Sequence, residues 1–181
     1  MRQDTRIQDE WLALRCQSGE REAFEDLVAV MEQPLLYYAA KLTGSTDRAL
    51  DVLQEAWIKA FAGLHGLREP AALRPWLYRL VRGLAVDRVR REAAREKAEE
   101  AWTDGFEEGA EPEFSAEDAD AIHAALDQLP LPHREVLVLH FIEEMPVAEI
   151  AAVVGCPAGT VKSRIHHAKR TMKRILTGGK Q

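Results

Sequence analysis

The sequence has little cysteine and no long apolar run, and each shortage excludes a class of protein. Only Cys16 and Cys156 occur in 181 residues, too few for a disulfide framework or a cysteine zinc site. No apolar run approaches the length of a membrane-spanning helix. From the polar stretch Met1–Arg6 we expect no secretory signal, and from the short tail after Leu176 we expect no further domain. We expect a cytoplasmic protein.

Convincing runs of alternating β-branched residues are also lacking. Apolar residues recur instead at intervals of three and four, which is the pattern of helices. Apolar residues make up 46% of the chain and charged residues 30%, a globular composition. These features predict an all-α fold.

The net charge of −6 is unevenly distributed, and its distribution divides the chain. Residues 1–91 contain 14 Lys/Arg and 13 Asp/Glu, residues 92–120 contain 2 and 12, and residues 121–181 contain 8 and 5. The acidity therefore belongs to one segment that also contains glycine and proline, which is typical of a linker. We predict two small helical domains joined by an acidic linker, with the boundaries 1–92, 93–117 and 118–181.

The expected helices follow from apolar spacing and from glycine and proline positions. In the first domain they are Asp9–Cys16, Glu20–Met31, Pro34–Leu42, Thr46–Ala62 and a long helix from Leu73 to Arg91 or beyond, with a loop over His65–Ala71. In the second domain they are Asp118–Leu129, His133–Glu143, Val147–Val154 and Pro157–Leu176.

A helix-turn-helix is predicted over Val147–Ile165. Gly155 is suited to ending the first helix in the left-handed conformation, and Pro157 suits the first turn of the next. The second helix has an apolar side, predicted to pack inward, that comprises Val161, Ile165, Ala168, Met172 and Leu176. Residues 157–180 contain seven Lys/Arg and no Asp or Glu. Such a basic face suits DNA in the major groove.

The first domain contains two further candidate surfaces. In the helix from Leu73 to Arg91, Arg79, Arg82 and Arg90 lie opposite an apolar stripe, with Tyr78 at the margin, an arrangement that suits nucleic acid. In the helix Thr46–Ala62, the residues expected inside are Leu50, Leu53, Trp57 and Phe61, and those expected on the surface are Asp51, Glu55, Ile58 and Ala62. The latter face fits either a protein-binding surface or an ordinary surface with one apolar residue.

Four motifs together resemble the extracytoplasmic-function sigma factors. The stretch 51–57 (DVLQEAW) resembles the polymerase-binding motif of the family, and 74–80 (RPWLYRL) with 87–91 (DRVRR) resembles its −10 element helix. Residues 129–137 and 159–164 (GTVKSR) resemble its −35 reading domain. The resemblance covers most of residues 10–92 and 118–176.

The resemblance implies a function and an assignment of residues. The protein would bind core RNA polymerase and direct initiation at specific promoters, and an anti-sigma factor would restrain it by covering the polymerase-binding surfaces of both domains. Core polymerase would contact Asp51, Gln54, Glu55 and Ile58. The −10 element would contact the loop His65–Ala72 and Arg74, Arg79, Arg82 and Arg90. The −35 duplex would contact Thr160, Lys162, Ser163, Arg164, His166, His167 and Arg170.

Two departures from the family pattern concern promoter specificity. Gly83 stands where the family often has asparagine, and His166 and His167 stand where arginine or larger aromatic residues are frequent. Neutral imidazoles attract phosphate less than arginine does, and their charge depends on pH.

Three other functions fit the sequence less well. An enzyme is disfavoured because the sequence has no glycine-rich phosphate loop, metal-spaced His/Cys set or nucleophile elbow, so no cofactor, metal, catalytic residue or small-molecule substrate is expected. A helix-turn-helix regulator that works without polymerase would leave the surface on Thr46–Ala62 unexplained. An interaction module without DNA binding would leave the basic face of residues 162–174 unexplained.

Overall fold

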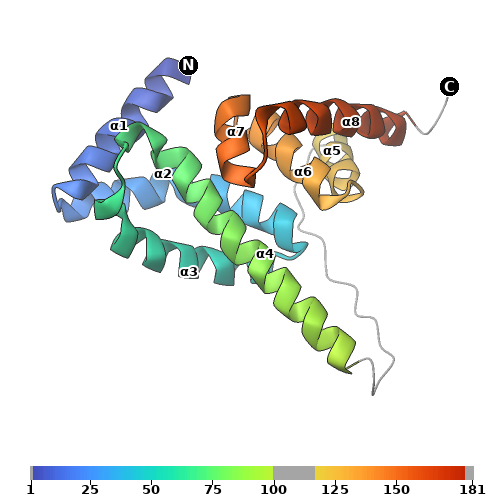
Figure 1. The fold of residues 1–181 in the computed structure, drawn as a ribbon, viewed down its shortest axis with the longest axis horizontal. Coiled ribbons are helices and arrows are strands. Elements are labelled where there is room, and N and C mark those ends of the chain that lie inside the picture. Colours follow the sequence, from blue (N-terminus) through green and yellow to red (C-terminus); the bar gives the residue numbers. More distant parts are fainter. Residues whose placement is uncertain (1, 100–116, 178–181) are drawn as a thin grey trace.

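The computed structural model describes residues 2–99 and 117–177, and every regular element in these two ranges is a helix (Figure 1). The first domain comprises α1 (Arg2–Gln17), α2 (Arg21–Thr43), α3 (Thr46–Gly63), the 3-10 turns η1 (Leu64–Gly66) and η2 (Pro70–Ala72), and α4 (Leu73–Glu99). The second domain comprises α5 (Glu117–Asp127), α6 (Leu131–Leu137), the π-helical turn η3 (Val138–Ile142), α7 (Val147–Val154) and α8 (Ala158–Leu176). The all-α prediction is confirmed.

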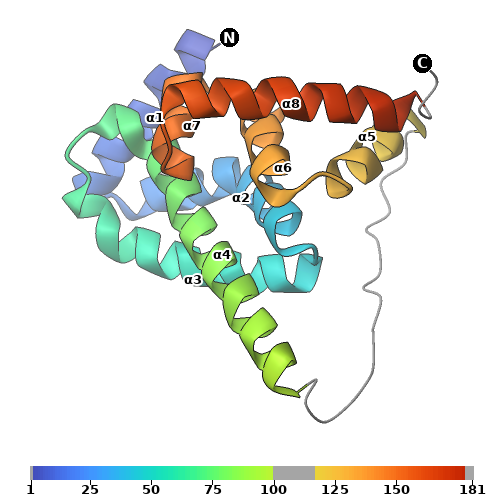
Figure 2. The ribbon, with the colours of Figure 1, turned by 45° about the vertical axis from the view of Figure 1, so that its right-hand side comes forward.

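The predicted helix ends are largely correct because local chemistry determines them. Gly44 and Gly155 end α2 and α7 with φ of 70° and 71°, in the left-handed region that glycine adopts without steric cost. The Ser45 side chain accepts a hydrogen bond from the Arg48 N–H and caps α3. The loop expected over His65–Ala71 consists mostly of the two 3-10 turns, and α4 continues as far as Glu99, away from the rest of the molecule (Figure 2).

The prediction of two helices on either side of Pro34 is wrong, because Pro34 lies inside the continuous helix α2. A proline inside a helix removes one hydrogen bond and costs about 3 kcal/mol. Here Met31 and Leu35, on either side of it, are buried in the core. Tertiary packing along the whole of α2 outweighs this local cost.

The inward face predicted for α3 is half wrong. Leu53 is buried, but Leu50 and Phe61 are 50% and 65% exposed. The residues that pack inward on α3 are mostly small ones, Ala49, Val52, Ala56 and Ala60. Small side chains let α3 lie close to α2 and α4, and the larger apolar residues face outward.

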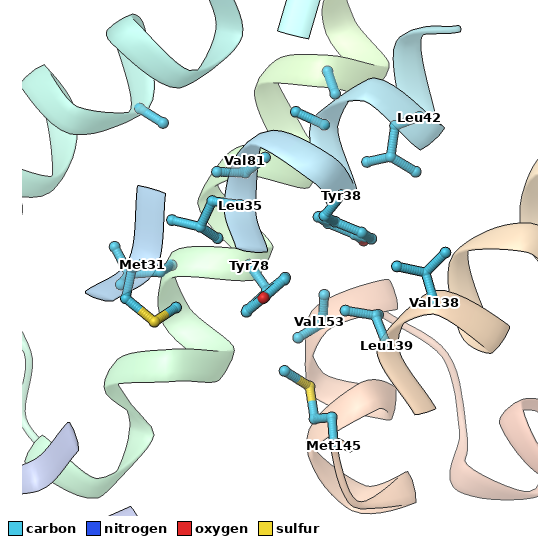
Figure 3. Packing of buried hydrophobic residues seen from close by; sticks show 14 of the residues in the cluster. Met31, Leu35, Tyr38, Leu42, Tyr78, Val81, Val138, Leu139, Met145 and Val153 are labelled. Carbon is cyan, nitrogen blue, oxygen red and sulfur yellow. The ribbon is translucent and has the colours of Figure 1, made fainter. Parts of the chain in front are cut away.

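The two domains pack against each other through a shared apolar core (Figure 3). Tyr38 of α2 and Tyr78 of α4 are both fully buried and meet edge to face, with ring centroids 5.2 Å apart. The second domain contributes residues from η3, the following turn and α7: Val138, Leu139, Met145 and Val153. Its position on the helix predicted that Tyr78 lies at the edge of an exposed basic face. That prediction is wrong, because Tyr78 is buried in the shared core.

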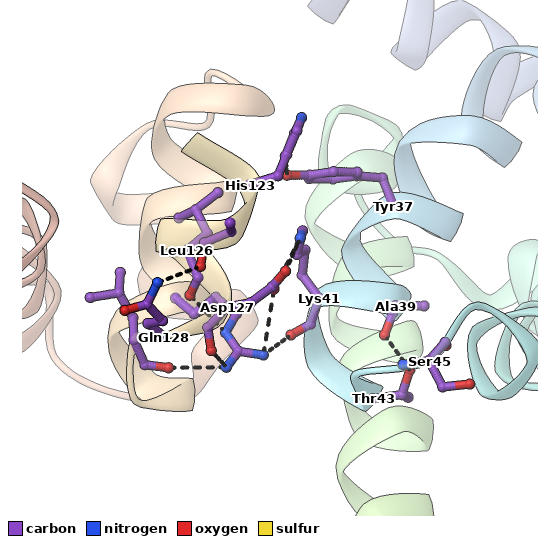
Figure 4. Close-up of polar contacts among 12 residues, drawn as sticks. Tyr37, Ala39, Lys41, Thr43, Ser45, His123, Leu126, Asp127 and Gln128 are labelled. Carbon is purple, nitrogen blue, oxygen red and sulfur yellow. Dashed lines mark hydrogen bonds and ion pairs between the residues drawn. The ribbon is translucent and has the colours of Figure 1, made fainter. Parts of the chain in front are cut away.

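Polar contacts join the domains at one edge of this core (Figure 4). Lys41 Nζ donates to Asp127 Oδ2 at 2.7 Å, and the Tyr37 hydroxyl lies 2.8 Å from His123 Nδ1. Arg134 donates to the Lys41 carbonyl at 2.9 Å and also to the carbonyls of Leu126, Asp127 and Leu129. One guanidinium thus secures the turn after α5 and reaches across to α2.

Candidate nucleic-acid and partner interfaces

The exposed face of α3 is the candidate polymerase surface. Asp51, Gln54, Glu55 and Ile58 are all exposed, as the sequence predicted, and Ile58 is 67% exposed. Leu50 and Phe61 lie on the same helix and are also exposed. The apolar part of this surface is therefore larger than sequence reasoning had predicted, and apolar residues surrounded by polar ones are typical of a protein-binding surface.

Two carboxylates of this surface are already in ion pairs. Arg88 of α4 donates to Asp51 Oδ2 at 2.7 Å, and Lys59 lies 2.8 Å from Glu55 Oε1, one turn away on α3. All four side chains are more than a third exposed, so water screens both pairs and each contributes little to stability. The carboxylates remain accessible to a partner.

The helix-turn-helix positions the candidate −35 surface. Val161, Ile165 and Ala168 are buried against the rest of the second domain, as predicted. Their burial turns Lys162, Ser163, His166, His167 and Arg170 outward, and all five are exposed. Thr160 is half-buried near the start of α8.

The inward face of α8 departs from the prediction at its far end. Leu176 is 46% exposed, although it was expected inside. It lines a groove of about 470 Å³ together with Ile122, Leu126, Leu137, Phe141, Ile142, Lys169, Met172, Lys173 and Thr177. The lining is mostly apolar, and its two lysines, Lys169 and Lys173, belong to α8, the helix that also bears the basic face. Sequence reasoning missed it, because no local pattern shows which helix fails to cover this end of α8.

Two of the four candidate −10 arginines are exposed, and the other two are held in ion pairs. Arg79 and Arg90 are exposed on α4. Arg74 is instead paired with Asp9 of α1, with Nε 2.7 Å from Oδ2, and both side chains are mostly buried. Gly83 lies on an exposed part of α4, where a Cβ would meet nothing within 4 Å.

Arg82 is paired across the domain interface. Its Nε donates to Glu135 Oε2 at 2.8 Å, and its Nη2 lies 3.3 Å from Oε1. Burial lowers the pKa of Arg82, but hydrogen bonding to Glu135 and the charge of that carboxylate outweigh it, and the net shift is upward. The guanidinium is therefore held in its charged form.

Glu135 also contacts a residue of the candidate −35 surface. The carboxylate is only 2% exposed, and Arg164 Nη1 lies 3.6 Å from its Oε1. One buried carboxylate thus joins an arginine from each candidate DNA surface. No local pattern predicts this arrangement, because Arg82 and Glu135 are 53 residues apart.

A second carboxylate, the half-buried Glu143, lies at the same interface. The Tyr78 hydroxyl donates to Glu143 Oε2. Burial raises the pKa of Glu143, while the hydrogen bond from Tyr78 and the charge of Arg74 act in the opposite direction. Burial also raises the pKa of Tyr78 well above its ordinary value, so this hydroxyl stays a donor.

The described part of the chain has neither a candidate metal site nor a candidate membrane span. It contains no group of three or more His, Cys, Asp or Glu residues placed to hold a metal ion. Within the same residues, no helix is both long and apolar enough to cross a membrane.

Comparison with known proteins assigns families to both domains. Residues 27–95 match the family model of sigma-70 region 2, and residues 119–172 match that of sigma-70 region 4. The chain is 30% identical to the ECF RNA polymerase sigma factor SigW of Bacillus subtilis, over 87% of this chain and 91% of that protein. It is 29% identical to the ECF RNA polymerase sigma-E factor of Escherichia coli K12, over 92% and 93%.

Solved structures share the fold. CnrH, determined in complex with the cytosolic domain of CnrY, is 28% identical, with a TM-score of 0.68 over 95% of this chain and 99% of that one. The sigma factor RpoE of Bartonella quintana, determined with the anti-sigma factor NepR, is 22% identical, with a TM-score of 0.74 over 85% and 96%.

Proposed function

The chain belongs to the extracytoplasmic-function RNA polymerase sigma factors, and from this premise we propose that it divides promoter recognition between its two domains. The observation that carries the proposal is the coexistence of two different surfaces in one chain. The exposed face of α3 combines apolar and acidic residues, and the exposed face of α8 is basic and free of carboxylates. A factor that joins polymerase to a promoter needs both.

The α3 surface is proposed to bind core RNA polymerase through Asp51, Gln54, Glu55 and Ile58. Leu50 and Phe61 extend the same surface and are added to this set. Burial of exposed apolar side chains supplies affinity, and the carboxylates supply orientation and charge complementarity.

The α8 surface is proposed to read the −35 duplex. Lys162 and Arg170 are suited to phosphate contacts, while Ser163, His166 and His167 present donors and acceptors that can meet base edges. Arg164 joins this set once its contact with Glu135 is broken.

The −10 element is proposed to contact α4 and the turns before it, with Arg79 and Arg90 on the exposed side of the helix. Arg82 belongs to the same set but is occupied by Glu135 in this conformation. Arg74 is proposed to act indirectly, because its pair with Asp9 fixes the start of α4 against α1.

An anti-sigma factor is proposed to restrain the protein. The sigma factor RpoE of Bartonella quintana, whose fold this chain shares, was determined with the anti-sigma factor NepR. Both domains here expose apolar side chains that such a partner would cover, on α3 and in the groove lined by Phe141 and Leu176. The protein is proposed to act in the cytoplasm with polymerase, without catalytic activity and without a cofactor.

The test is reconstitution with purified core RNA polymerase. The protein is first assayed for binding to core, and the complex then transcribes genomic fragments in a run-off assay. Binding to core with discrete start sites that depend on the factor supports the proposal. Folded protein that binds promoter DNA but not core would instead identify a helix-turn-helix regulator that works without polymerase.

A further inference from the structure

The exposed large apolar side chains of the second domain gather in one place. Within residues 117–177, all of them line the groove of about 470 Å³ between α5, η3 and α8. Each is between 44% and 52% exposed: Ile122, Phe141, Ile142 and Leu176. A single exposed apolar residue is ordinary, whereas exposed apolar residues that form one patch mark a surface that binds another segment of protein. The groove is therefore a candidate docking site.

One wall of the groove is positively charged. Lys169 and Lys173 of α8 line it, and the Lys169 Nζ lies 5.5 Å from the centroid of the Phe141 ring. Among the described residues neither lysine has a carboxylate partner. Residues 157–180 contain no Asp or Glu that could supply one from α8 itself. An occupant that fits this site therefore combines a large apolar side chain with carboxylates beside it.

The chain itself contains a segment of that chemistry. Residues 100–116, which lie outside the described residues, contain six Asp/Glu and no Lys or Arg. The large apolar side chains of this acidic segment are all aromatic: Trp102, Phe106 and Phe114. Phe114 stands in the sequence EPEFSAED (residues 111–118), so it has carboxylates on both sides.

The acidic segment is joined directly to a wall of the groove. Phe114 precedes Glu117, the first residue of α5, by three positions, and Ile122 of α5 lines the groove. Helix α5 packs on α8, the opposite wall (Figure 2). Three residues span up to about 11 Å and five residues of helix rise about 7.5 Å, so a chain that turns back before α5 brings Phe114 within reach of the groove. So short a connection gives an effective concentration on the order of millimolar, at which even a weak contact is populated.

We infer that the acidic segment docks in the groove of its own chain, with Phe114 as the apolar anchor and the neighbouring carboxylates facing Lys169 and Lys173. This docking does not depend on what α8 or the groove binds in the proposed function. It has a consequence for every partner of the groove. Such a partner must displace the segment, so its apparent affinity is reduced according to the fraction of chains in which the groove is free.

Methionine methyl NMR of the full chain tests the contact, because the chain has only four methionines and one of them lines the groove. Met172 is that residue, while Met31 and Met145 are buried in the core and report on folding. An aromatic ring that contacts a methyl group shifts its signal. Phe114→Ala should therefore move the Met172 signal and leave the signals of Met31 and Met145 unchanged.

Phe106→Ala is the matched control, since it removes the same ring from the same acidic segment, eight residues farther from α5. It should leave the Met172 signal at its wild-type position. Raising the salt concentration should move the wild-type Met172 signal toward its position in Phe114→Ala, because screening weakens the contacts with the two lysines.

A synthetic peptide of residues 111–118 tests the same contact from a separate molecule. Added to the Phe114→Ala chain at about millimolar concentration, it should return the Met172 signal toward its wild-type position. The same peptide with alanine in place of its phenylalanine should have no such effect.

The position of the Met172 signal also distinguishes the other possible occupants. A signal that is the same in wild type and in Phe114→Ala overturns the inference, as does one that moves with Phe106→Ala instead. A wild-type signal that changes with protein concentration, together with a dimer in sedimentation, identifies a second copy of the chain as the occupant and overturns the inference equally. A shift that is specific to Phe114→Ala and independent of concentration supports docking within one chain.

Discussion

Replacing Leu139 with alanine tests whether the two domains unfold as one unit. Leu139 is fully buried in the core shared by the domains, near Tyr78 (Figure 3). Truncating a leucine at such a site costs about 3 kcal/mol, because lost transfer energy and the remaining cavity add. Leu139 belongs to the second domain, whereas Trp57 and Trp76 belong to the first. A loss of stability caused in the second domain can therefore be detected by the tryptophan fluorescence of the first.

The assay is urea unfolding followed by tryptophan fluorescence and by circular dichroism. Residues 118–181 contain no tryptophan, and a Trp102→Phe background removes the one in the acidic segment. We expect Leu139→Ala to lower the unfolding free energy equally by both signals. Leu27→Ala, at a fully buried site of the first domain, shows that the fluorescence signal responds to such a loss. A fluorescence transition unchanged by Leu139→Ala would refute cooperative packing of the domains.

Three further variants test individual surfaces. Asp51→Arg should weaken core-polymerase binding by about tenfold or more, because like charges at an interface repel. Arg88→Ala is the control: it breaks the same ion pair without adding a charge to α3, and it should retain binding in a pull-down. Arg170→Ala should weaken duplex binding, reduce its salt dependence by about one phosphate contact, and leave core affinity intact. Burial raises the pKa of the Glu143 carboxyl above its ordinary value of 4.5. The protonated carboxyl therefore contributes its full stability to the folded protein below pH 4.5, and this contribution is lost as the pH rises through the raised pKa. Glu143→Gln should therefore be more stable than wild type at neutral pH, with a difference in thermal unfolding that disappears below pH 4.5.

Local signals explain what could be predicted from the sequence. Gly44 and Gly155 are needed where a helix ends with positive φ, and no other residue adopts that conformation as easily. The helix-turn-helix and the outward face of α8 follow from the spacing of Val161, Ile165 and Ala168, since each is separated from the next by about one turn. Such features depend on neighbours within a few residues.

The errors arose where distant packing decides between two local possibilities. On α3, a face of large apolar residues and a face of small ones both fit helical spacing. Proximity to α2 and α4 selected Ala56 and Ala60 and left Leu50 and Phe61 outside. Pro34 is tolerated for the same reason, because tertiary contacts hold both halves of α2 in line.

The candidate site was predicted as a set of faces but not as a set of contacts. Helical spacing correctly placed Asp51 and Arg170 on the surface. It also placed Arg82 on a free basic face, although that arginine meets Glu135 from the other domain. A pattern within one helix cannot show that a second domain will cover part of it, and the most informative contact of the structure is of that kind.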